Sequence, residues 1–474
     1  MTASTAALRA PQRQAILTVD LGFGDAGKGS IVDFLTREHA AHTVVRYNGG
    51  AQAGHRVVDS GQPGHRVVDS GQPGREHVFS QFGSGTLAGA ATHLSRFMLL
   101  DPLAMLVEAE HLHELGCHAV MARTTIDAGA LVTTPFQAAA NRLKEIARGA
   151  GRHGSCGMGI GETAADALAH GARVLRAGDL ADAATTVRKL RFLQRLNRAK
   201  VAALGGALPE TATVAAELAL LEDPAALDWL MARYADFTRQ VQIVGGAHLH
   251  ALLRRPGAVI FEGAQGVLLD EAVGFHPHTT WSNITPGNAL RLLAEAGYTD
   301  PVTRVGITRA YATRHGAGPF VSEEPALAAA LPDPANHFGA WQEGFRVGWL
   351  DLVLLRYAAA VTGALDYVAV TCLDRLAALP VRQVCTAYAN GRERVERLAP
   401  AATVGDLVHQ ADLTRLLGAC RPVLAPVADQ AELLRLIEAA TGAPAALLSY
   451  GASAHEKRWA TCIPTAARVP AHTG

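Results

Sequence analysis

A glycine-rich turn near the N-terminus constrains the fold of this chain more than any other feature. The turn, GFGDAGKGS at Gly22–Ser30, joins a short β-favouring run, Ala15–Val19, to a segment with helical apolar spacing. Its glycines allow a close backbone approach to an anion, the helix N-terminus offers unpaired N–H groups, and Lys28 adds a positive charge. The sequence predicts a phosphate-binding loop. A plain tight turn is the alternative, because Lys28 lies between two glycines and departs from the GxxxxGK[ST] pattern.

Similar β-favouring runs recur along the chain and predict the rest of the sheet. They are Thr43–Arg46, Ala258–Phe261, Val302–Ile307, Tyr367–Thr371 and Ala446–Ser449. Long helical stretches rich in Ala, Leu and Arg separate these runs, which favours an α/β fold with a large, mostly parallel central sheet flanked by helices. The longest helical tract, about 180–253, breaks near 205–209 without a flexible linker. We therefore expect a flexible N-terminus over 1–12 and a single catalytic domain with helical insertions over 13–474.

The charge balance limits the partners of the chain. Its 474 residues carry 43 Lys plus Arg and 43 Asp plus Glu, so no net charge attracts nucleic acid or an anionic membrane. No segment resembles a signal peptide or a membrane span, and we expect a cytoplasmic protein. The six cysteines form no CxxC pair, which argues against a zinc site.

A tandem repeat creates one ambiguity. The ten residues HRVVDSGQPG at His55–Gly64 recur unchanged at His65–Gly74. Ten residues are too few for a repeat architecture, so we interpret the second copy as a duplication that a hairpin-like loop absorbs. Either His55 or His65 could then serve a site formed by this segment.

Ordered motifs across the chain carry a family resemblance. They are GDAGKGSIVDFL, VVRYNGGAQAGH, FEGAQGVLLD at Phe261–Asp270, TTWSNITPG at Thr279–Gly287, AYATRHGAGPF at Ala310–Phe320, GWLD at Gly348–Asp351 and TCLD at Thr371–Asp374. Together they resemble the adenylosuccinate synthetase family over about 13–460. The resemblance implies a homodimer that uses GTP and Mg²⁺ to phosphorylate the 6-oxygen of IMP, after which the amine of aspartate displaces that phosphate.

The catalytic residues follow from this resemblance. Asp25 matches the family's aspartate, which removes the N1 proton of the purine and binds Mg²⁺, and a carboxylate suits both tasks. A helix cap is the structural alternative for Asp25. His55 follows Ala-Gly, as the family's general-acid histidine does, whereas His65 follows Pro-Gly; we therefore favour His55. The carbonyl of Gly54 is the second expected Mg²⁺ ligand, and Lys28 supplies charge for phosphoryl transfer.

The nucleotide-binding residues also match family motifs. Those expected to bind GTP are Gly24, Gly27 and Gly29 in the turn, Asp374 on the edge of the guanine, and Ser449 and Gly451 beside that base. Those expected to bind the purine nucleotide are Gln265, Thr280, Ser155 and Arg314. Several positions depart from the family: Cys372 replaces a lysine before Asp374, and Met158 replaces an arginine after Ser155. Ala26 and Ser30 replace a glutamate and a lysine of the turn, and His170 stands where a neighbouring subunit's arginine is expected. The resemblance therefore predicts a weaker hold on both nucleotides.

The largest departure lies before Gly348–Asp351. Where the family carries Thr-Thr-Gly and four arginines that hold the aspartate carboxylates, this chain has Trp341, Gln342 and Glu343, and only Arg346 remains. Guanidinium groups hold a carboxylate with two parallel hydrogen bonds, and a glutamate repels it. We expect an amine other than aspartate in this loop. Two alternatives remain: a genuine adenylosuccinate synthetase, and an inactive nucleotide-binding sensor or scaffold.

Overall fold

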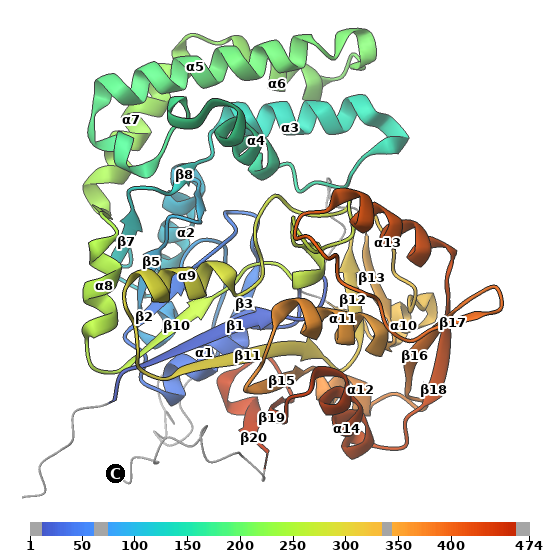
Figure 1. The fold of residues 1–474 in the computed structure, drawn as a ribbon. Coiled ribbons are helices and arrows are strands. Elements are labelled where there is room, and N and C mark those ends of the chain that lie inside the picture. The colour runs from blue at the N-terminus through green and yellow to red at the C-terminus, as the bar shows by residue number, and fades with distance from the viewer. Residues whose placement is uncertain (1–11, 61–73, 334–343, 461–474) are drawn as a thin grey trace, which may run out of the picture.

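A ten-stranded sheet forms the centre of the molecule (Figure 1). The structure, a computed structural model, describes residues 12–60, 74–333 and 344–460. In sheet order the strands are β20 (Lys457–Trp459), β19 (Ala445–Ser449), β15 (Tyr367–Thr371), β11 (Val302–Arg309), β1 (Gln14–Asp20), β10 (Ala258–Glu262), β2 (Thr43–Arg46), β5 (Ala91–Leu94), β7 (Thr124–Asp127) and β9 (Gln242–Val244). All neighbours pair in parallel except β19 and β20. The predicted fold class is confirmed.

The six runs predicted as strands form the middle of this sheet. They correspond to β1, β2, β10, β11, β15 and β19, and β1 lies between β10 and β11. Five of these strands are buried along nearly their whole length, because helices cover both faces of the sheet. The sequence analysis missed β5, β7, β9 and β20, which have three or four residues each.

Helices fill the connections between the strands. Their bounds are α1 (Lys28–Glu38), α2 (Pro102–Glu114), α3 (Pro135–Arg148), α4 (Ile160–His170), α5 (Ala183–Ala202), α6 (Ala212–Glu222), α7 (Ala225–Gln240), α8 (Ala247–Arg254), α9 (Gly287–Glu295), α10 (Pro325–Ala330), α11 (Leu352–Thr362), α12 (Leu373–Ala377), α13 (Leu407–Ala419) and α14 (Gln430–Thr441). In Figure 1, α3 to α6 form a layer above the sheet. The expected break near 205–209 separates α5 from α6, but the tract also breaks before Pro224 and contains β9.

Short strands outside the main sheet complete the fold. They are β3 (His55–Asp59), β4 (Arg75–Phe79), β6 (Leu99–Leu100), β8 (Leu131–Val132), β12 (Ala312–His315), β13 (Phe345–Gly348), β14 (Leu350–Asp351), β16 (Gln383–Asn390), β17 (Glu393–Val395) and β18 (Arg421–Pro426). Strands β3 and β4 pair antiparallel, with Asp59 opposite Arg75. The first copy of the repeat therefore begins as a strand, whereas the second copy lies outside the described residues apart from Gly74, and so does the N-terminal stretch up to residue 11.

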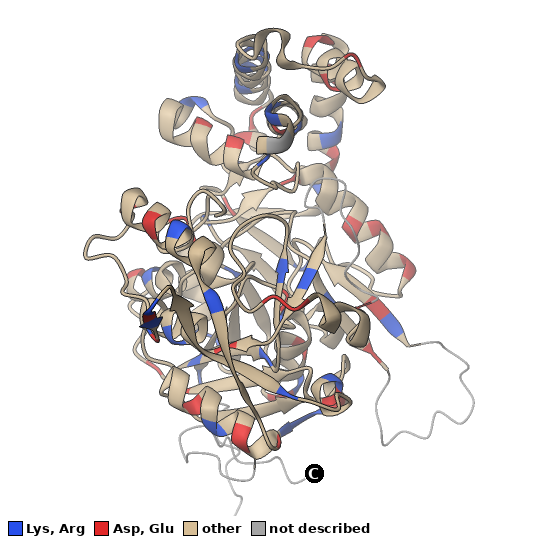
Figure 2. Cartoon of the chain, turned by 90° about the vertical axis from the view of Figure 1, so that its right-hand side faces the viewer, with Lys and Arg blue, Asp and Glu red and all other residues tan. Residues whose placement is uncertain are grey.

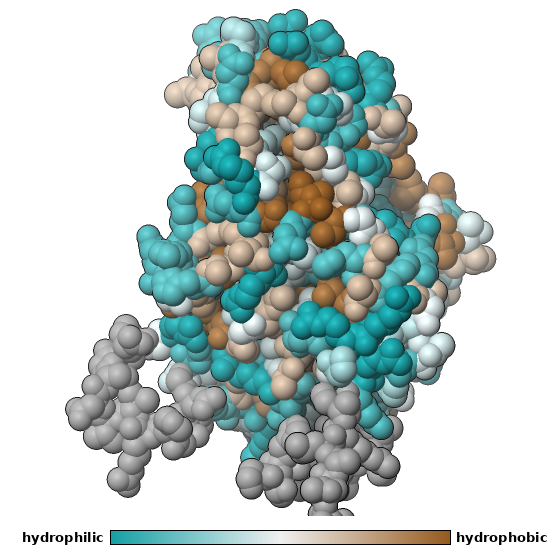
Figure 3. Space-filling view, turned by 90° about the vertical axis from the view of Figure 1, so that its left-hand side faces the viewer, coloured by the Kyte–Doolittle hydropathy of each residue, from teal (hydrophilic) through white to brown (hydrophobic). Residues whose placement is uncertain are grey.

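The surface agrees with the even charge balance. Figure 2 shows basic and acidic residues interspersed over the helices rather than gathered by sign. Figure 3 shows apolar residues gathered in the upper part of one face, among hydrophilic neighbours. Among the described residues, no helix combines the length and the apolar character that crossing a membrane requires.

Candidate active site

A cleft of about 1050 Å³ lies at the carboxyl ends of the central strands. In parallel α/β sheets this edge is where ligands bind. Every predicted site residue that the structure describes lines the cleft, with one exception. These residues are Gly24, Asp25, Gly27, Lys28, Gly29, Gly54, His55, Ser155, Gln265, Thr280, Arg314, Asp374, Ser449 and Gly451. The exception is Arg346. Segments more than 400 residues apart thus meet in one cleft.

The glycine turn presents the N-terminus of α1 to the cleft. Gly27 precedes the helix in the left-handed region with a φ of 84°, and within the described turn no side chain caps the helix. A Cβ atom on Gly29 would lie 2.8 Å from the carbonyl carbon of His55, so β3 passes too close for any larger residue. The ammonium of Lys28 is buried and lies 2.8 Å from Asp20. Open N–H groups beside a lysine suit a phosphate.

Asp25 lies on the turn itself rather than at the helix cap. Its backbone has a φ of 56°, and its carbonyl accepts a 2.5 Å hydrogen bond from Nε of Arg309. The carboxylate is 28% exposed and lies 3.3 Å from Nε2 of His315, which also lines the cleft. A non-glycine residue in this conformation is uncommon and is often held so at functional sites. Sequence reasoning missed His315, whose only signal was its place in the Ala310–Phe320 motif.

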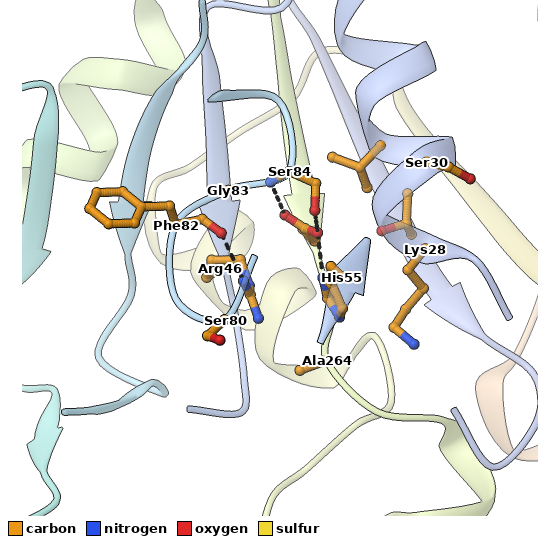
Figure 4. Close-up of polar contacts among 12 residues, drawn as sticks. Lys28, Ser30, Arg46, His55, Ser80, Phe82, Gly83, Ser84 and Ala264 are labelled. Carbon is orange, nitrogen blue, oxygen red and sulfur yellow. Dashed lines mark hydrogen bonds and ion pairs between the residues drawn. The ribbon is translucent and has the colours of Figure 1, made fainter. Parts of the chain in front are cut away.

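His55 lies at the start of β3 and is held from behind by a buried glutamate (Figure 4). Its Nδ1 atom lies 2.6 Å from Oε1 of Glu262, and Oε2 of Glu262 accepts a 2.9 Å hydrogen bond from the backbone N–H of Ser84. Burial lowers the pKa of His55 to about 4, although Glu262 opposes this effect. Burial alone would raise the pKa of Glu262, but the charge of Arg46 and its contacts with His55 and Ser84 lower it to about 2. Both shifts act in the same sense, toward an ionised carboxylate beside a neutral imidazole.

The expected guanine pocket gathers at the ends of β15 and β19. The hydroxyl of Thr371 donates a 2.8 Å hydrogen bond to the carbonyl of Ala26, which ties this edge to the glycine turn. Asp374 lies in the first turn of α12, and burial raises the pKa of its carboxyl group. The hydroxyl of Ser449 donates to the carbonyl of Gly451 at 3.1 Å. A carboxylate and several backbone groups thus surround one end of the cleft.

The residues predicted to bind the purine nucleotide come from separate loops. Gln265 has a φ of 55°, and its buried Oε1 atom has no hydrogen-bond partner among the described residues. The hydroxyl of Ser155 lies 3.0 Å from the amide nitrogen of Asn141. Thr280 donates its backbone N–H to the carbonyl of Leu269 at 2.8 Å. Because buried polar atoms are nearly always bonded, the unpaired amide oxygen of Gln265 can accept a hydrogen bond from a polar group in the cleft.

Arg314 is the most buried cation of the cleft. Its guanidinium donates to the carbonyls of Ala317 and Pro319, at 3.2 and 2.8 Å, and lies over the ring of Phe23. Burial and the nearby charge of Arg346 lower the pKa of Arg314 to about 9. Carbonyl oxygens do not neutralise the positive charge of Arg314, so a bound anion would be stabilised beside it. The predicted contact with a nucleotide phosphate would supply such an anion.

The opposite wall, formed by α3 and α4, carries cations that are already paired. The ammonium of Lys144 lies 2.7 Å from Glu162, which also pairs at 2.9 Å with Lys200 on α5, outside the cleft. Arg148 pairs with the buried Glu145, which also accepts the backbone N–H of Gly154 at 3.0 Å. Lys144 and Arg148 are thus paired with carboxylates, as Lys28 is paired with Asp20.

The predicted amine-binding loop is only partly described. Trp341, Gln342 and Glu343 lie outside the described residues. Arg346, on β13, is bound to Glu323 and donates to the carbonyls of Gly316 and Gly318, at 3.1 and 2.9 Å. Arg346 therefore holds the loop after β12 through hydrogen bonds, and it does not line the cleft.

The carboxylate of Asp25 and the carbonyl of Gly54 fit a magnesium ion that takes its other ligands from phosphates and water. Asp25 and Gly54 both line the cleft beside the helix N-terminus. Among the described residues no group of three or more His, Cys, Asp or Glu side chains could hold a metal. Magnesium is commonly bound through one or two carboxylates, with phosphates and water completing its shell.

A parallel sheet with a phosphate-type glycine turn and a polar cleft at its strand ends defines an α/β nucleotide-binding protein. Residues 17–457 match the adenylosuccinate synthetase family model. The chain therefore belongs to the adenylosuccinate synthetase family.

Individual relatives agree with this assignment. An adenylosuccinate synthetase of Anaeromyxobacter sp. (strain Fw109-5) is 34% identical over 379 residues, covering 79% of this chain and 80% of the relative. That of Myxococcus xanthus (strain DK1622) is 32% identical and covers 93% and 97%.

Two solved structures share the fold. The fully ligated adenylosuccinate synthetase from Plasmodium falciparum has a TM-score of 0.73 at 19% identity, covering 94% of this chain and 99% of that one. A cyanophage S-2L succinoaminodeoxyadenylate synthetase bound to dGMP and dATP has a TM-score of 0.58 at 15% identity, covering 96% and 97%.

Proposed function

We propose that this protein is a GTP- and Mg²⁺-dependent ligase that joins C6 of IMP, or of a related 6-oxopurine nucleotide, to an amine other than aspartate. The observation that carries the proposal is the meeting of Asp25, Lys28, His55 and Asp374 in one cleft. These residues match the family's chemistry-bearing positions, whereas the changed positions lie where the family recognises substrates.

Each residue has a physical task in the proposed reaction. Asp25 takes the N1 proton of the purine while the 6-oxygen forms a bond to the γ-phosphorus of GTP and the bond to the leaving GDP breaks. Lys28 and the N-terminus of α1 stabilise the transferring phosphoryl group. Bound Mg²⁺, held by Asp25 and Gly54, would neutralise phosphate charge. The amine then forms the C6–N bond, inorganic phosphate leaves, and the amine gives up a proton.

The remaining residues would select and orient the two nucleotides. Asp374 would accept the N1–H and 2-amino groups of guanine, beside Ser449 and Gly451. The unpaired amide of Gln265 would contact the second purine, while Ser155, Thr280 and Arg314 would face its ribose phosphate.

The choice of amine rests on the segment before Gly348. Arg346 is bound to Glu323, and residues 341–343 contribute an aromatic ring, an amide and an acid instead of arginines. The two carboxylates of aspartate would find no pair of arginines in residues 341–343 to bind them. A neutral or cationic amine, such as an amino sugar or a different amino acid, suits these side chains better.

One assay tests the proposal. The protein is incubated with GTP, Mg²⁺ and IMP while the amine is varied, and GDP and new purine absorbance are followed together. We expect turnover with a neutral or cationic amine and little with aspartate. Efficient turnover with aspartate would identify a genuine adenylosuccinate synthetase instead.

Two other outcomes concern the remaining class of function. GDP release that does not depend on an amine would indicate the 6-phosphoryl intermediate without its acceptor. GTP binding without turnover for any amine would favour a sensor or scaffold. We also propose a cytoplasmic homodimer, on family resemblance, and sedimentation analysis would measure its mass.

A further inference from the structure

One buried carboxylate touches a proposed catalytic residue without lining the cleft. Glu262 is the last residue of β10 and is fully buried. Its Oε1 atom lies 2.6 Å from Nδ1 of His55. Its other oxygen accepts the backbone N–H of Ser84 at 2.9 Å, and the hydroxyl of Ser84 donates to the first oxygen. In Figure 4 the dashed lines of these contacts lie between Ser84 and His55, with Arg46 on one side of His55 and Lys28 on the other.

The surroundings keep this carboxylate charged and fixed. Arg46 is fully buried beside it and donates to the carbonyl of Phe82 at 3.0 Å. Its Nε and Nη2 atoms have no hydrogen-bond partner in the described part of the chain. A buried carboxylate needs donors and a nearby cation, and Glu262 has both. It can therefore act only as a hydrogen-bond acceptor.

This geometry selects one tautomer of His55. Because Glu262 only accepts, Nδ1 of His55 must carry the proton between them. Nε2 of the neutral ring then bears a lone pair. That atom is buried and has no partner among the described residues, while His55 itself lines the cleft. Hydrogen bonding at one ring nitrogen commonly fixes the role of the other.

We propose that Glu262 is a positioning residue that fixes the Nδ1–H tautomer and the ring orientation of His55, so that Nε2 is the atom presented to the reacting group. The kinetic consequence rests on the proposed function, whereas the tautomer does not. In this arrangement Glu262 occupies Nδ1, so His55 contacts the reacting group through Nε2.

Glu262→Gln should reverse the tautomer. The backbone N–H of Ser84 needs an oxygen opposite it, so the amide NH₂ must face Nδ1 of His55. Nδ1 then accepts, and the ring proton moves to Nε2. Glu262→Asp keeps an acceptor-only group and should preserve the original tautomer.

Long-range ¹H–¹⁵N spectra of the ligand-free, full-length protein with ¹⁵N-labelled histidine report the tautomer directly. His55 is assigned by comparison with His55→Asn. We expect the Nδ1–H form in the native protein and in Glu262→Asp, and the Nε2–H form in Glu262→Gln. An Nε2–H form in the native protein, or no change in Glu262→Gln, would overturn the proposal.

Kinetics then separate positioning from general stability. Glu262→Gln should lower kcat for GDP release by roughly 10²-fold, with the KM values for GTP and IMP changed by less than about threefold, as for other groups that orient catalytic or ligating histidines. The tautomer determines which ring nitrogen faces the reacting group, so its loss should lower kcat without changing how GTP and IMP bind. Unchanged kcat would contradict the positioning role.

Glu108→Gln is the matched control. Glu108 is also buried, accepts the backbone N–H groups of Ser80 and Gln81 at 2.8 and 2.9 Å, and lies 3.5 Å from Nε2 of His77. Neither Glu108 nor His77 lines the cleft. We expect its kcat to be unchanged, and an equal loss of kcat in both variants would overturn the positioning role. A native protein that releases no GDP would instead refute the proposed function, and the spectra would still decide the tautomer.

Discussion

The two walls of the cleft are built differently. The strand-end wall consists of the glycine turn, His55, Gln265 and Asp374, which follow buried strands of the central sheet. The helical wall consists of polar residues on α3, α4 and the loop between them. On the strand-end wall, Nε2 of His55 and Oε1 of Gln265 are buried without partners among the described residues. On the helical wall, Lys144 already has a carboxylate partner, Glu162.

This difference separates chemistry from recognition. Unsatisfied atoms on a rigid sheet edge are ready to meet a ligand, and their geometry is set by the fold. The charged pairs of the helical wall lie on α3 and α4, outside the sheet, so replacing both partners together need not alter the strands. We infer that the strand-end wall performs the common reaction of the family, while the opposite wall can change with the substrate.

The strongest test of this comparison is Asp25→Asn. Asparagine tolerates the φ of 56° at this position, but it cannot accept the purine N1 proton. We expect turnover to fall by roughly 10³-fold or more, within the range of general-base contributions, while thermal unfolding changes little. Residual activity near the native rate would remove Asp25 from its assigned role.

The second test concerns the contact between the turn and β3. In Gly29→Ala the new Cβ atom would lie 2.8 Å from the carbonyl carbon of His55 and 2.9 Å from the carbonyl oxygen of Arg56. We expect a loss of about 2–3 kcal/mol in the free energy of unfolding, measured by denaturant titration, together with loss of turnover. Gly418→Ala in α13 is the control, because its Cβ would meet nothing within 4 Å and should stabilise the helix by up to about 1 kcal/mol.

The third test asks whether the sheet beneath the strand-end wall depends on neutral histidines. His93 on β5 is buried, with Nδ1 2.8 Å from the hydroxyl of Thr125, and burial together with the charge of His248 lowers its pKa to about 3. Below about pH 6.5 the unfolded chain takes up a proton that the folded chain refuses, so stability falls as the pH decreases toward 3. Between pH 7 and 5 His93 should account for a loss of about 2 kcal/mol.

His93→Gln isolates this contribution. Its free energy of unfolding should depend less steeply on pH between 7 and 5 than that of the native protein. Identical slopes for the two proteins would show that His93 is not the source of the pH dependence.

The smallest expected effect is on the helical wall. Ser155→Ala removes the hydroxyl that lies 3.0 Å from the amide nitrogen of Asn141. Loss of one neutral hydrogen bond should raise the KM for the purine nucleotide by about fivefold, or about 1 kcal/mol, and leave kcat unchanged. Initial rates at varied IMP measure both constants. A large fall in kcat would place the helical wall in the reacting step and break the distinction drawn here.

The parts of the structure that the sequence predicted share a physical cause. Fully buried parallel strands such as β2 and β15 read as continuous apolar runs, and the glycine turn is a local pattern. The missed strands β5 and β7 are as long as β2 but include polar residues (ATHL and TTID), and β9 has only three residues. The glycine turn, Gln265 and Asp374 follow such buried runs closely, whereas His55 opens β3, nine residues after the end of β2.

The missed site residues depend on contacts that are distant in sequence. Glu262 meets His55 across 207 residues, and the only local sign was an acid ending an apolar run. His315 lies near Asp25 only because β12 folds back over the turn. The ion pair between Arg346 and Glu323 is likewise a tertiary contact, and the sequence before Gly348 did not reveal it.

The tandem repeat lies within the hairpin of β3 and β4, so a change in the number of copies would change the length of the connection between these two strands. Asp59 and Arg75 face each other at its end, bridged at 2.5 Å, and the duplicated segment follows beyond that bridge. Because the two copies are identical, excising residues 65–74 would leave the same sequence on both sides of the junction. The residues that pair in β3 and β4, His55–Asp59 and Arg75–Phe79, would all remain in the shortened chain, so a change in copy number need not alter the strand pair that begins at His55.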